Sequence, residues 1–269
     1  CDAIVHLAAM NRHNDPEVIY NTNISLVKKL ITACESTNST PHILFSSSTQ
    51  EERDNPYGKS KKEGRQLFEQ WALNNNAHFT GLIIPNVYGP FGHPYYNSVV
   101  ATFCHQLTHN ETPKIEVDGE VRLIYVGELV AIIIDEIIRT QLTQIEHIPA
   151  DKISENQSNQ RHQRSIPHTA TIKVSELLNK LQHYKINYFE KGEIPNIDNP
   201  FDRNLWNTFL CYLDHENFFP FHLKLNTDNR GSFVETIKLN SGGQISFSTT
   251  VPGITRGNHY HTRKAECFA

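Results

Sequence analysis

Short apolar runs alternate with longer stretches of helical periodicity along the first half of the chain. Residues 1–9, 43–46 and 78–84 are runs of strand length. Residues 18–34 and 63–73 lie between them and place apolar side chains at intervals of three and four, the period of a helix with one buried face. Parallel strands need such crossover helices, so the alternation predicts an α/β fold with a parallel sheet.

Local signals predict where several elements begin and end. Asp15 is a candidate N-cap, and Pro16 follows it at the first helical position, where proline loses no hydrogen bond. The segments 114–117 and 122–126 flank an Asp-Gly pair, a pattern that predicts a β-hairpin. Further helices are predicted over 98–107, 127–139 and 174–181, and a polar loop over 151–165.

One segment carries the side chains that carbonyl reduction needs. Tyr57 and Lys61 are four positions apart where the second helical stretch opens, so they share one helix face. An ammonium group beside a phenol favours the phenolate and is expected to lower the pKa of Tyr57. Tyr57 is then a candidate proton donor to a ketone, or acceptor from an alcohol. Ser48, at the end of the preceding strand, is a candidate to hold the carbonyl oxygen, and a nicotinamide cofactor would supply the hydride.

A tyrosine and a lysine at this spacing are not specific by themselves. The spacing recurs at Tyr260 and Lys264, which we interpret as coincidence. The first pair gains weight from its context, because it follows a strand-like run ending in three serines and opens a helical stretch. The alternative for the first pair is a helix start with a solvated lysine.

The composition limits the class of protein. With 25 Lys and Arg against 29 Asp and Glu the formal net charge is −4, and no basic stripe favours a nucleic-acid partner. No apolar run is long enough to predict a membrane span. The five cysteines are scattered and never spaced C-x-x-C, which is typical of reduced thiols, so we expect a cytoplasmic protein.

The character of the chain changes near residue 220. Segments 233–239 and 244–249 have strand character around a Ser-Gly-Gly turn, and no helical pattern follows them. We therefore predict an α/β domain over 1–216 and the start of an all-β module over 217–269.

The first part, about 2–139, resembles the extended short-chain dehydrogenase/reductase family of nucleotide-sugar epimerases and reductases. Ser48, Tyr57 and Lys61 match its catalytic triad, and the resemblance implies that Lys61 also binds the nicotinamide ribose. Asn23 stands where the family keeps a helical asparagine that supports the active site. Further positions match its ligand contacts: Leu7, Ala8, Ala9, Pro85 and Val87 for the NAD(P) cofactor, Asn86 for cofactor and sugar, and Arg122 for the nucleotide diphosphate.

This resemblance has two departures. Ile83 stands where many relatives carry arginine, and the glycine-rich turn that holds the cofactor pyrophosphate at a helix N-terminus is absent. We expect that turn to lie before residue 1. The Rossmann-type sheet would then lack its first β-α-β unit, and the chain would be a fragment truncated at both ends.

A second motif lies near the end of the chain. Gly253, His259, His261 and Glu266 fit the cupin pattern G-x5-H-x-H-x4-E. Alternation along a strand puts both histidines on one face, and two imidazoles with a carboxylate suit zinc or another divalent metal. The residues around His259 also resemble the R-G-x-H segment of deoxysugar-ketone epimerases, cupins in which this histidine is the catalytic base. His259 is therefore a candidate metal ligand and a candidate base.

Together the two parts resemble bifunctional enzymes of capsular polysaccharide biosynthesis, in which a reductase precedes a cupin epimerase domain of jelly-roll fold. The resemblance implies C3 epimerisation of a UDP-linked 4-keto-6-deoxy-HexNAc, followed by reduction of the C4 ketone with NADPH or NADH, toward UDP-N-acetyl-L-fucosamine. The ketone acidifies the C3 proton, so epimerisation has to precede reduction. We also expect a homodimer.

Two alternatives stay open. One is a nucleotide-sugar 4-epimerase or dehydratase, although dehydratases usually place an acidic pair after a catalytic threonine and Thr49 and Gln50 follow Ser48 here. The other is a non-catalytic dinucleotide-sensing scaffold, for which a broken triad would be the expected mark.

Overall fold

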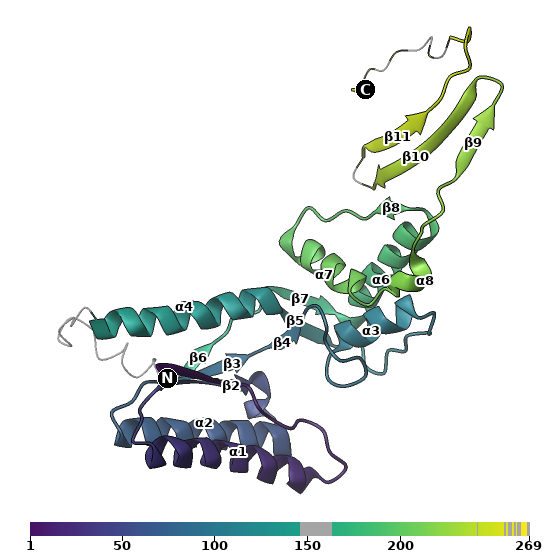
Figure 1. The fold of residues 1–269 in the computed structure, drawn as a ribbon. Helices are drawn as coiled ribbons and strands as arrows, with labels where there is room; N and C mark the ends of the chain where they lie inside the picture. Colours follow the sequence, from purple (N-terminus) through teal and green to yellow (C-terminus); the bar gives the residue numbers. More distant parts are fainter. Residues whose placement is uncertain are drawn as a thin grey trace.

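The described strands form three sheets, of which the first is a parallel sheet (Figure 1). The structure, a computed structural model, describes residues 1–145, 163–240, 242–255, 257, 260, 262 and 265–267. The strand order of the first sheet is β1-β2-β3-β6, with every neighbouring pair parallel. Its strands are β1 (Ala3–His6), β2 (His42–Ser48), β3 (Phe79–Ile84) and β6 (Gln163–Ser165). The predicted parallel α/β sheet is therefore confirmed, while β6 lies where a loop was predicted.

Helices cover the first sheet on both faces. They are α1 (Pro16–Ser36), α2 (Pro56–Asn74) and α4 (Val126–Ile145). Figure 1 shows α1 and α2 on one face of the sheet and α4 on the other. Phe45 of β2 belongs to the core with α1 and α2, whereas its neighbour Leu44 belongs to the core with α4. Their exposures of 2% and 0% are typical of a parallel strand that is covered on both sides.

Polar side chains cap several of the helices, among them α1, α2 and the helix that follows Ser98. Asp15 accepts a hydrogen bond from a backbone N–H in the first turn of α1, as predicted. Asn55 accepts a hydrogen bond from the Gly58 N–H at 2.7 Å, so α2 begins just before Tyr57. Ser98 caps α3 (Val99–Thr108), which confirms the helix predicted there. Each cap satisfies one N–H that the helix itself leaves unpaired.

The second sheet is arranged differently from the prediction. It consists of β4 (Asn86–Tyr88), β5 (Glu120–Tyr125) and β7 (Ala170–Lys173). β5 pairs in parallel with β4 and antiparallel with β7. The predicted hairpin of 114–117 with 122–126 is wrong, because both edges of β5 are occupied by strands from elsewhere and 114–117 is irregular.

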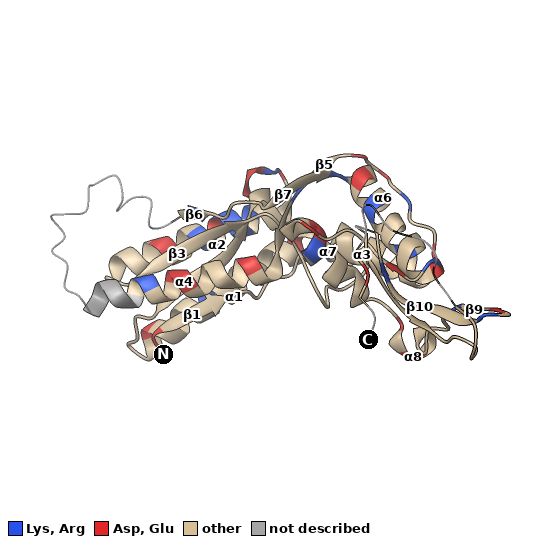
Figure 2. Cartoon of the chain, turned by 90° about the horizontal axis from the view of Figure 1, so that it is seen from above, with Lys and Arg blue, Asp and Glu red and all other residues tan. Residues whose placement is uncertain are grey.

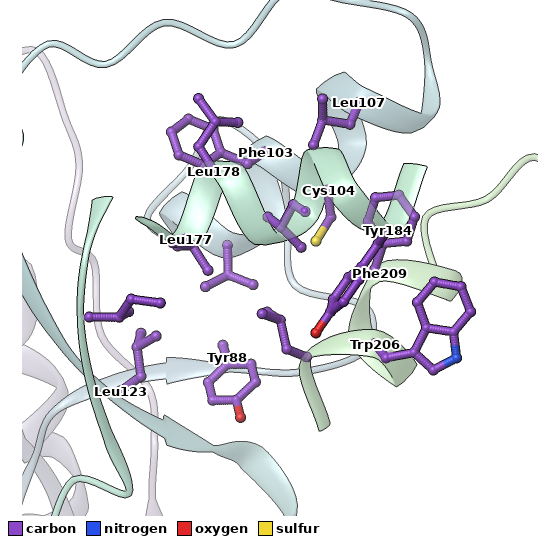
Figure 3. Packing of buried hydrophobic residues seen from close by; sticks show 14 of the residues in the cluster. Tyr88, Phe103, Cys104, Leu107, Leu123, Leu177, Leu178, Tyr184, Trp206 and Phe209 are labelled. Atoms are coloured by element: carbon purple, nitrogen blue, oxygen red, sulfur yellow. The ribbon is translucent and has the colours of Figure 1, made fainter. Parts of the chain in front are cut away.

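Helices packed beside the second sheet complete another core (Figure 3). They are α3, α6 (Val174–Lys185), the π-helical turn η4 (Ile186–Glu190) and α7 (Pro200–Leu210). Leu177 and Leu181 of α6 and Leu205 and Phe209 of α7 are all 0% exposed. The helix α6 confirms a prediction, whereas α7 was missed although its buried residues are spaced four apart.

The last described strands pair antiparallel within a third sheet, which is mixed. These strands are β9 (Leu225–Asp228), β10 (Gly231–Leu239) and β11 (Gln244–Ser248), and the short helix α8 (His215–Phe218) precedes them. β10 pairs antiparallel with β9 and β11, and its end pairs in parallel with β8 (Glu193–Ile194). The two predicted strands are confirmed as β10 and β11, while the jelly-roll fold and the domain boundary stay predictions.

Residues of both charge signs, Lys and Arg or Asp and Glu, are interspersed along the helices and strands drawn in Figure 2. Some are neutralised in pairs, such as Arg65 with Glu51 and Lys238 with Glu193. Among the described residues, no helix is long and apolar enough to cross a membrane.

Candidate active site

A cleft of about 330 Å³ opens at the carboxyl ends of the strands of the first sheet. Open α/β sheets bind their ligands in this position, outside the strand ends. Most residues predicted for catalysis or cofactor binding line the cleft: Leu7, Ala9, Ser48, Tyr57, Lys61, Pro85, Asn86 and Val87. Ala8 is exposed beside two of them but is not part of the lining. The fold thus brings together side chains that are far apart in the sequence.

The burial of Lys61 alters its protonation. The residue is 2% exposed, and its Nζ donates a hydrogen bond to the Ser46 backbone oxygen at 2.7 Å. The Nζ also lies 4.8 Å from the centre of the Phe45 ring, a cation–π contact. Burial lowers the pKa of Lys61 to about 8, although the Glu51 carboxylate acts in the opposite direction. Lys61 is therefore charged at pH 7 and loses its proton about one pH unit higher.

Tyr57 differs from the prediction in its acidity. Its ring centre lies 5.7 Å from Lys61 Nζ. Burial raises the pKa of Tyr57, and the nearby Tyr96 hydroxyl raises it further. The prediction that Lys61 lowers this pKa is wrong here, because desolvation dominates and the ammonium group hydrogen-bonds to Ser46. Tyr57 is consequently protonated at neutral pH, the state that a proton donor needs.

A short 3-10 turn, η1 (Thr49–Glu52), connects Ser48 to the segment that leads into α2. Ser48 caps this turn by accepting a hydrogen bond from the backbone N–H two residues further on, at 3.2 Å. Glu51 is bound by Arg65 through three N–H···O contacts of 3.0 to 3.2 Å and by the Ser47 hydroxyl. The Arg65 and Glu51 side chains are only 11% and 9% exposed, so this charge-assisted pair holds the turn against α2.

Gly58 allows α2 to pack closely against the same turn. A Cβ atom at position 58 would lie 2.1 Å from the backbone oxygen of Gln50 and 3.2 Å from that of Arg53. No side chain tolerates such a distance to a backbone oxygen, so the position requires glycine. This close approach brings the helix that carries Tyr57 and Lys61 next to the turn that carries Ser48.

Asn23 of α1 supports the cleft from below. Its Oδ1 accepts a hydrogen bond from the Met10 N–H at 2.7 Å, and its Nδ2 donates to the Met10 oxygen and to Ser60 Oγ, both at 2.9 Å. Ser60 Oγ in turn donates to the Tyr57 backbone oxygen at 2.8 Å. This amide is 4% exposed and ties the segment after β1 to the first turn of α2, the kind of support that the resemblance implied.

Arg122 lies apart from this cleft. It is an exposed residue of β5, and its backbone oxygen accepts a hydrogen bond from Asn86 Nδ2 at 3.3 Å. Its side chain is not part of the lining of the cleft. The diphosphate contact that the resemblance implied for Arg122 therefore stays a prediction.

A second cleft of about 470 Å³ adjoins the first. The two clefts share the wall formed by Tyr96, Asn97 and Ser98. The second cleft is also lined by two cationic residues, Arg12 and Lys114. Sequence reasoning missed these cations, because the loops that carry them have no periodic pattern.

Several other polar residues of the first cleft were also missed. They are Asn11, Gln50, His93, Tyr96 and Asn97. Their closeness in sequence to recognised segments could have indicated them. Asn11 and Gln50 lie two residues after matched positions, and the other three follow the segment that contains Asn86.

The predicted metal motif lies mostly outside the described residues. His259 and His261 are both outside them, and Glu266 is described as exposed. Within the described part of the chain, no group of three His, Cys, Asp or Glu side chains could hold a metal ion. The metal site thus stays a prediction from the sequence.

The parallel sheet, its covering helices and a cleft at the strand ends define a Rossmann-like α/β protein of the dinucleotide-binding class. Comparison with family models agrees: the NAD dependent epimerase/dehydratase family matches residues 1–135, and the polysaccharide biosynthesis C-terminal domain matches residues 226–269. The chain belongs to the NAD dependent epimerase/dehydratase family.

Individual relatives extend this result. A UDP-2-acetamido-2,6-beta-L-arabino-hexul-4-ose reductase of Pseudomonas aeruginosa is 31% identical over 99% of this chain and 67% of its own length. The crystal structure of the capsular polysaccharide assembling protein CapF from Staphylococcus aureus is 34% identical, with a TM-score of 0.75 over 97% of this chain and 66% of that one. The chain thus spans about two thirds of the length of these relatives.

More distant structures share the fold alone. A UDP-N-acetylglucosamine 4-epimerase from Bacillus cereus is 18% identical, with a TM-score of 0.53 over 69% of this chain and 63% of that one. At this identity, the likeness supports the α/β architecture and carries no information about the reaction.

Proposed function

We propose that this chain contains the reductase site of an enzyme that reduces the C4 ketone of a UDP-linked 2-acetamido-4-keto-6-deoxy sugar. The observation that carries the proposal is the gathering of Ser48, Tyr57 and Lys61 along one cleft at the strand ends. The name of the Pseudomonas aeruginosa relative, a reductase of a UDP-2-acetamido-hexul-4-ose, supports this substrate class. The product would serve the synthesis of a capsular polysaccharide, in line with the name of the CapF structure.

The cleft fits a nicotinamide cofactor. Leu7 and Ala9 at the end of β1, with Pro85 and Val87 on another wall, offer a mainly apolar surface to a flat ring. Leu7 is 62% exposed, an uncovered apolar side chain at the place where a cofactor would pack. When bound, NADPH or NADH supplies the hydride.

The side chains of the cleft then have distinct roles. The Tyr57 hydroxyl donates a proton to the ketone oxygen, and the raised pKa of Tyr57 means that it is protonated at working pH. The Ser48 hydroxyl donates a hydrogen bond to the same oxygen and orients it. The Lys61 ammonium stabilises negative charge that develops on that oxygen and on Tyr57, and would also bind the ribose of the cofactor.

The second cleft is a suitable place for the nucleotide part of the substrate. Arg12 and Lys114 provide positive charge there, and arginine in particular binds phosphate oxygens. Tyr95 and Tyr96 provide aromatic surface for a base. In this arrangement the sugar extends past Tyr96 into the first cleft, and the ketone reaches Tyr57.

Two contacts argue against the alternative dehydratase. Glu51, the acidic residue after Ser48, is bound by Arg65 and by Ser47 and is not available for proton transfer. Gln50 is neutral and lines the cleft. The cleft therefore has no free carboxylate next to Ser48 among the described residues.

The test is Tyr57→Phe in the full-length protein, with NADPH oxidation by the keto-sugar as the assay. General acid catalysis contributes roughly a hundred- to ten-thousand-fold, so turnover should fall by that amount while cofactor binding persists. Tyr260→Phe is the matched control, since Tyr260 has the same spacing to a lysine but is 86% exposed. Near-normal turnover of Tyr57→Phe would refute the role of this residue.

The remaining predictions complete the proposal. Residues 1–216 would form the reductase domain, and 217–269 would begin a cupin module that epimerises C3, with His259 as metal ligand or base. Zinc or another divalent metal would be bound by His259, His261 and Glu266. The five cysteines have free thiols in the structure, in keeping with a cytoplasmic location, and the homodimer stays a prediction.

A further inference from the structure

Asn11 is a residue of the first cleft whose side chain has no hydrogen-bond partner among the described residues. It lies five residues after the end of β1, on the cleft wall that also contains Leu7 and Ala9. Its Oδ1 atom is enclosed by the protein and accepts no hydrogen bond, and within the described residues its Nδ2 donates none. An enclosed polar group without a partner is costly, so a native structure needs a reason to keep it.

The position within the cleft distinguishes Asn11 from similar groups. Within the described part of the chain, four other side chains have a buried polar atom without a partner: His6, His42, Trp71 and Gln106. None of these four lines the cleft. Asn11 is therefore the member of this set that lines the cleft, where a turn of its carboxamide would present it to a ligand.

The backbone that carries Asn11 is held in place. The Met10 N–H and the Met10 oxygen are both hydrogen-bonded to Asn23, at 2.7 and 2.9 Å. The carboxamide of Asn11 can nevertheless turn, because its terminal torsion is broad and no hydrogen bond restrains it. A fixed backbone with an unrestrained amide is suited to presenting either the oxygen or the nitrogen to a ligand.

We propose that Asn11 binds the 2-acetamido group of the sugar and makes the cleft selective for amino-sugar substrates, an inference that rests on the proposed function. An acetamido group offers one N–H donor and one carbonyl acceptor, and the Asn11 carboxamide offers the complementary acceptor and donors. Because the N–H and the carbonyl of a trans acetamido group point in opposite directions, Asn11 would accept from the first or donate to the second. A 2-hydroxyl group offers no carbonyl acceptor and places its own donor differently. The acetamido carbon C2 is two bonds from the ketone carbon, so both groups belong in the cleft that contains Tyr57.

The test compares two keto-sugar nucleotides, one with a 2-acetamido and one with a 2-hydroxyl group, in the full-length protein. Asn11→Ala should lower kcat/KM on the order of ten- to a hundred-fold for the acetamido substrate, because the substrate amide then lacks its partner. The hydroxyl substrate should change less than about threefold. Asn11→Asp is isosteric and keeps an acceptor, so its kcat/KM for the acetamido substrate should lie between those of the wild type and Asn11→Ala.

Asn14 provides a matched control. It is exposed in the same segment and does not line the cleft, so Asn14→Ala should leave both substrates unaffected. If Asn11→Ala lowered kcat/KM equally for both substrates, the residue would have a structural role. If kcat/KM fell for neither substrate, Asn11 would not contact the substrate. Both results would overturn the inference.

A binding measurement keeps the inference separate from the proposed function. Calorimetry with UDP-N-acetylglucosamine and UDP-glucose, neither of which needs to react, should show a preference for the first in the wild type. Asn11→Ala should remove this preference. If the wild type reduced neither keto-sugar, the proposed function would fail, while the binding preference would still decide the role of Asn11.

Discussion

The parallel sheet and the C-terminal strands β9 to β11 are both ladders of hydrogen-bonded backbone, but only the first is covered. Ile43 and Leu44 of β2 are 0% exposed, whereas Ile245 and Phe247 of β11 are 61% and 63% exposed. The first sheet is held between helices on both faces, while the β10 strand is linked to the middle of the chain by its short pairing with β8. The same strand character in the sequence therefore corresponds to very different degrees of burial.

This difference bears on where chemistry can be positioned. Catalytic side chains have to be held within a fraction of an ångström, which requires packed surroundings. The candidate site around Tyr57 has them, through the buried Glu51 pair, the close approach at Gly58 and the amide of Asn23. The predicted metal ligands lie in the part of the chain whose described strands have exposed apolar residues.

The largest expected effect tests whether the two regions carry separate reactions. In the full-length protein, His259→Ala should abolish or strongly slow exchange of the C3 proton of the keto-sugar with solvent, whereas Tyr57→Phe should leave this exchange intact. NMR of the keto-sugar in deuterated water measures both. Loss of exchange in Tyr57→Phe, or full exchange in His259→Ala, would contradict a division of labour. A metal assay on His259→Ala then separates a ligand from a base, since only loss of a ligand releases metal.

The next effect measures the difference in burial directly. Leu44→Ala should destabilise the protein by about 2–5 kcal/mol, because it leaves a cavity in a packed core. Ile245→Ala should cost less than about 0.5 kcal/mol, because that side chain is already in water. Denaturant unfolding followed by the fluorescence of Trp71 and Trp206 gives both values. Equal costs would mean that another part of the protein covers β11 in solution.

A third experiment tests how tightly α2 packs against the turn η1, which follows Ser48. Gly58→Ala should destabilise the protein by about 3 kcal/mol and reduce turnover, because the new Cβ pushes α2 away from the turn of Ser48. Gly119→Ala is the control, since a Cβ there meets nothing within 4 Å. The same unfolding experiment and the NADPH assay serve both variants. A harmless Gly58→Ala would show that the turn is looser than its contacts indicate.

The smallest expected effect is a difference in pH dependence between two lysines. The pKa of Lys61 is lowered to about 8 by burial, whereas the pKa of Lys238 is raised by its hydrogen bond to Glu193. Between pH 10.5 and 8 the unfolded chain keeps a proton on Lys61 that the folded chain releases, so the contribution of Lys61 to stability is lost as pH falls through about 8. The contribution of Lys238 has the opposite sign, being present below its unfolded pKa and lost as pH rises through its folded pKa.

Methionine substitutions at both lysines test these signs. Relative to the wild type, Lys61→Met should be more favourable at pH 7 than at pH 10.5, because the buried lysine has to be kept charged only at the lower pH. Lys238→Met should shift in the opposite direction, by a smaller amount because the pair is exposed. Unfolding free energies at the two pH values supply the measurement. Parallel shifts of both variants would contradict the assigned burial of Lys61.

Local patterns in the sequence were sufficient for many elements. The cap at Asp15, the helices that start near Ser98 and Val174, and the strands β10 and β11 were predicted because each depends on neighbouring residues. Gly58 is part of the recognised motif, but the sequence did not show why glycine is required there. The Gln50 backbone oxygen that it approaches lies eight residues away in a different element.

Errors arose where partners come from distant parts of the chain. The Asp-Gly pair predicted a hairpin before β5, whereas β5 pairs with β4 and with β7. The segment of β6 was predicted as a loop because its three residues form a strand by pairing with β3, and their own sequence has no strand pattern. The acidity of Tyr57 was predicted from one neighbour, Lys61, whereas desolvation by the whole surrounding structure decided it.

The sequence by itself determined the alternation of strands and helices, the shared helix face of Tyr57 and Lys61, and the strand that leads to the serines before Tyr57, because periodicity and spacing are local properties. The tertiary structure alone decided which residues meet across the cleft, including Asn11 and Tyr96, and which stay outside it, as Arg122 does. It also decided the protonation of Lys61, since burial depends on the packing of all neighbouring elements. The physical reason is that contacts and desolvation join residues far apart in the chain, and no spacing along the sequence encodes their distance in space.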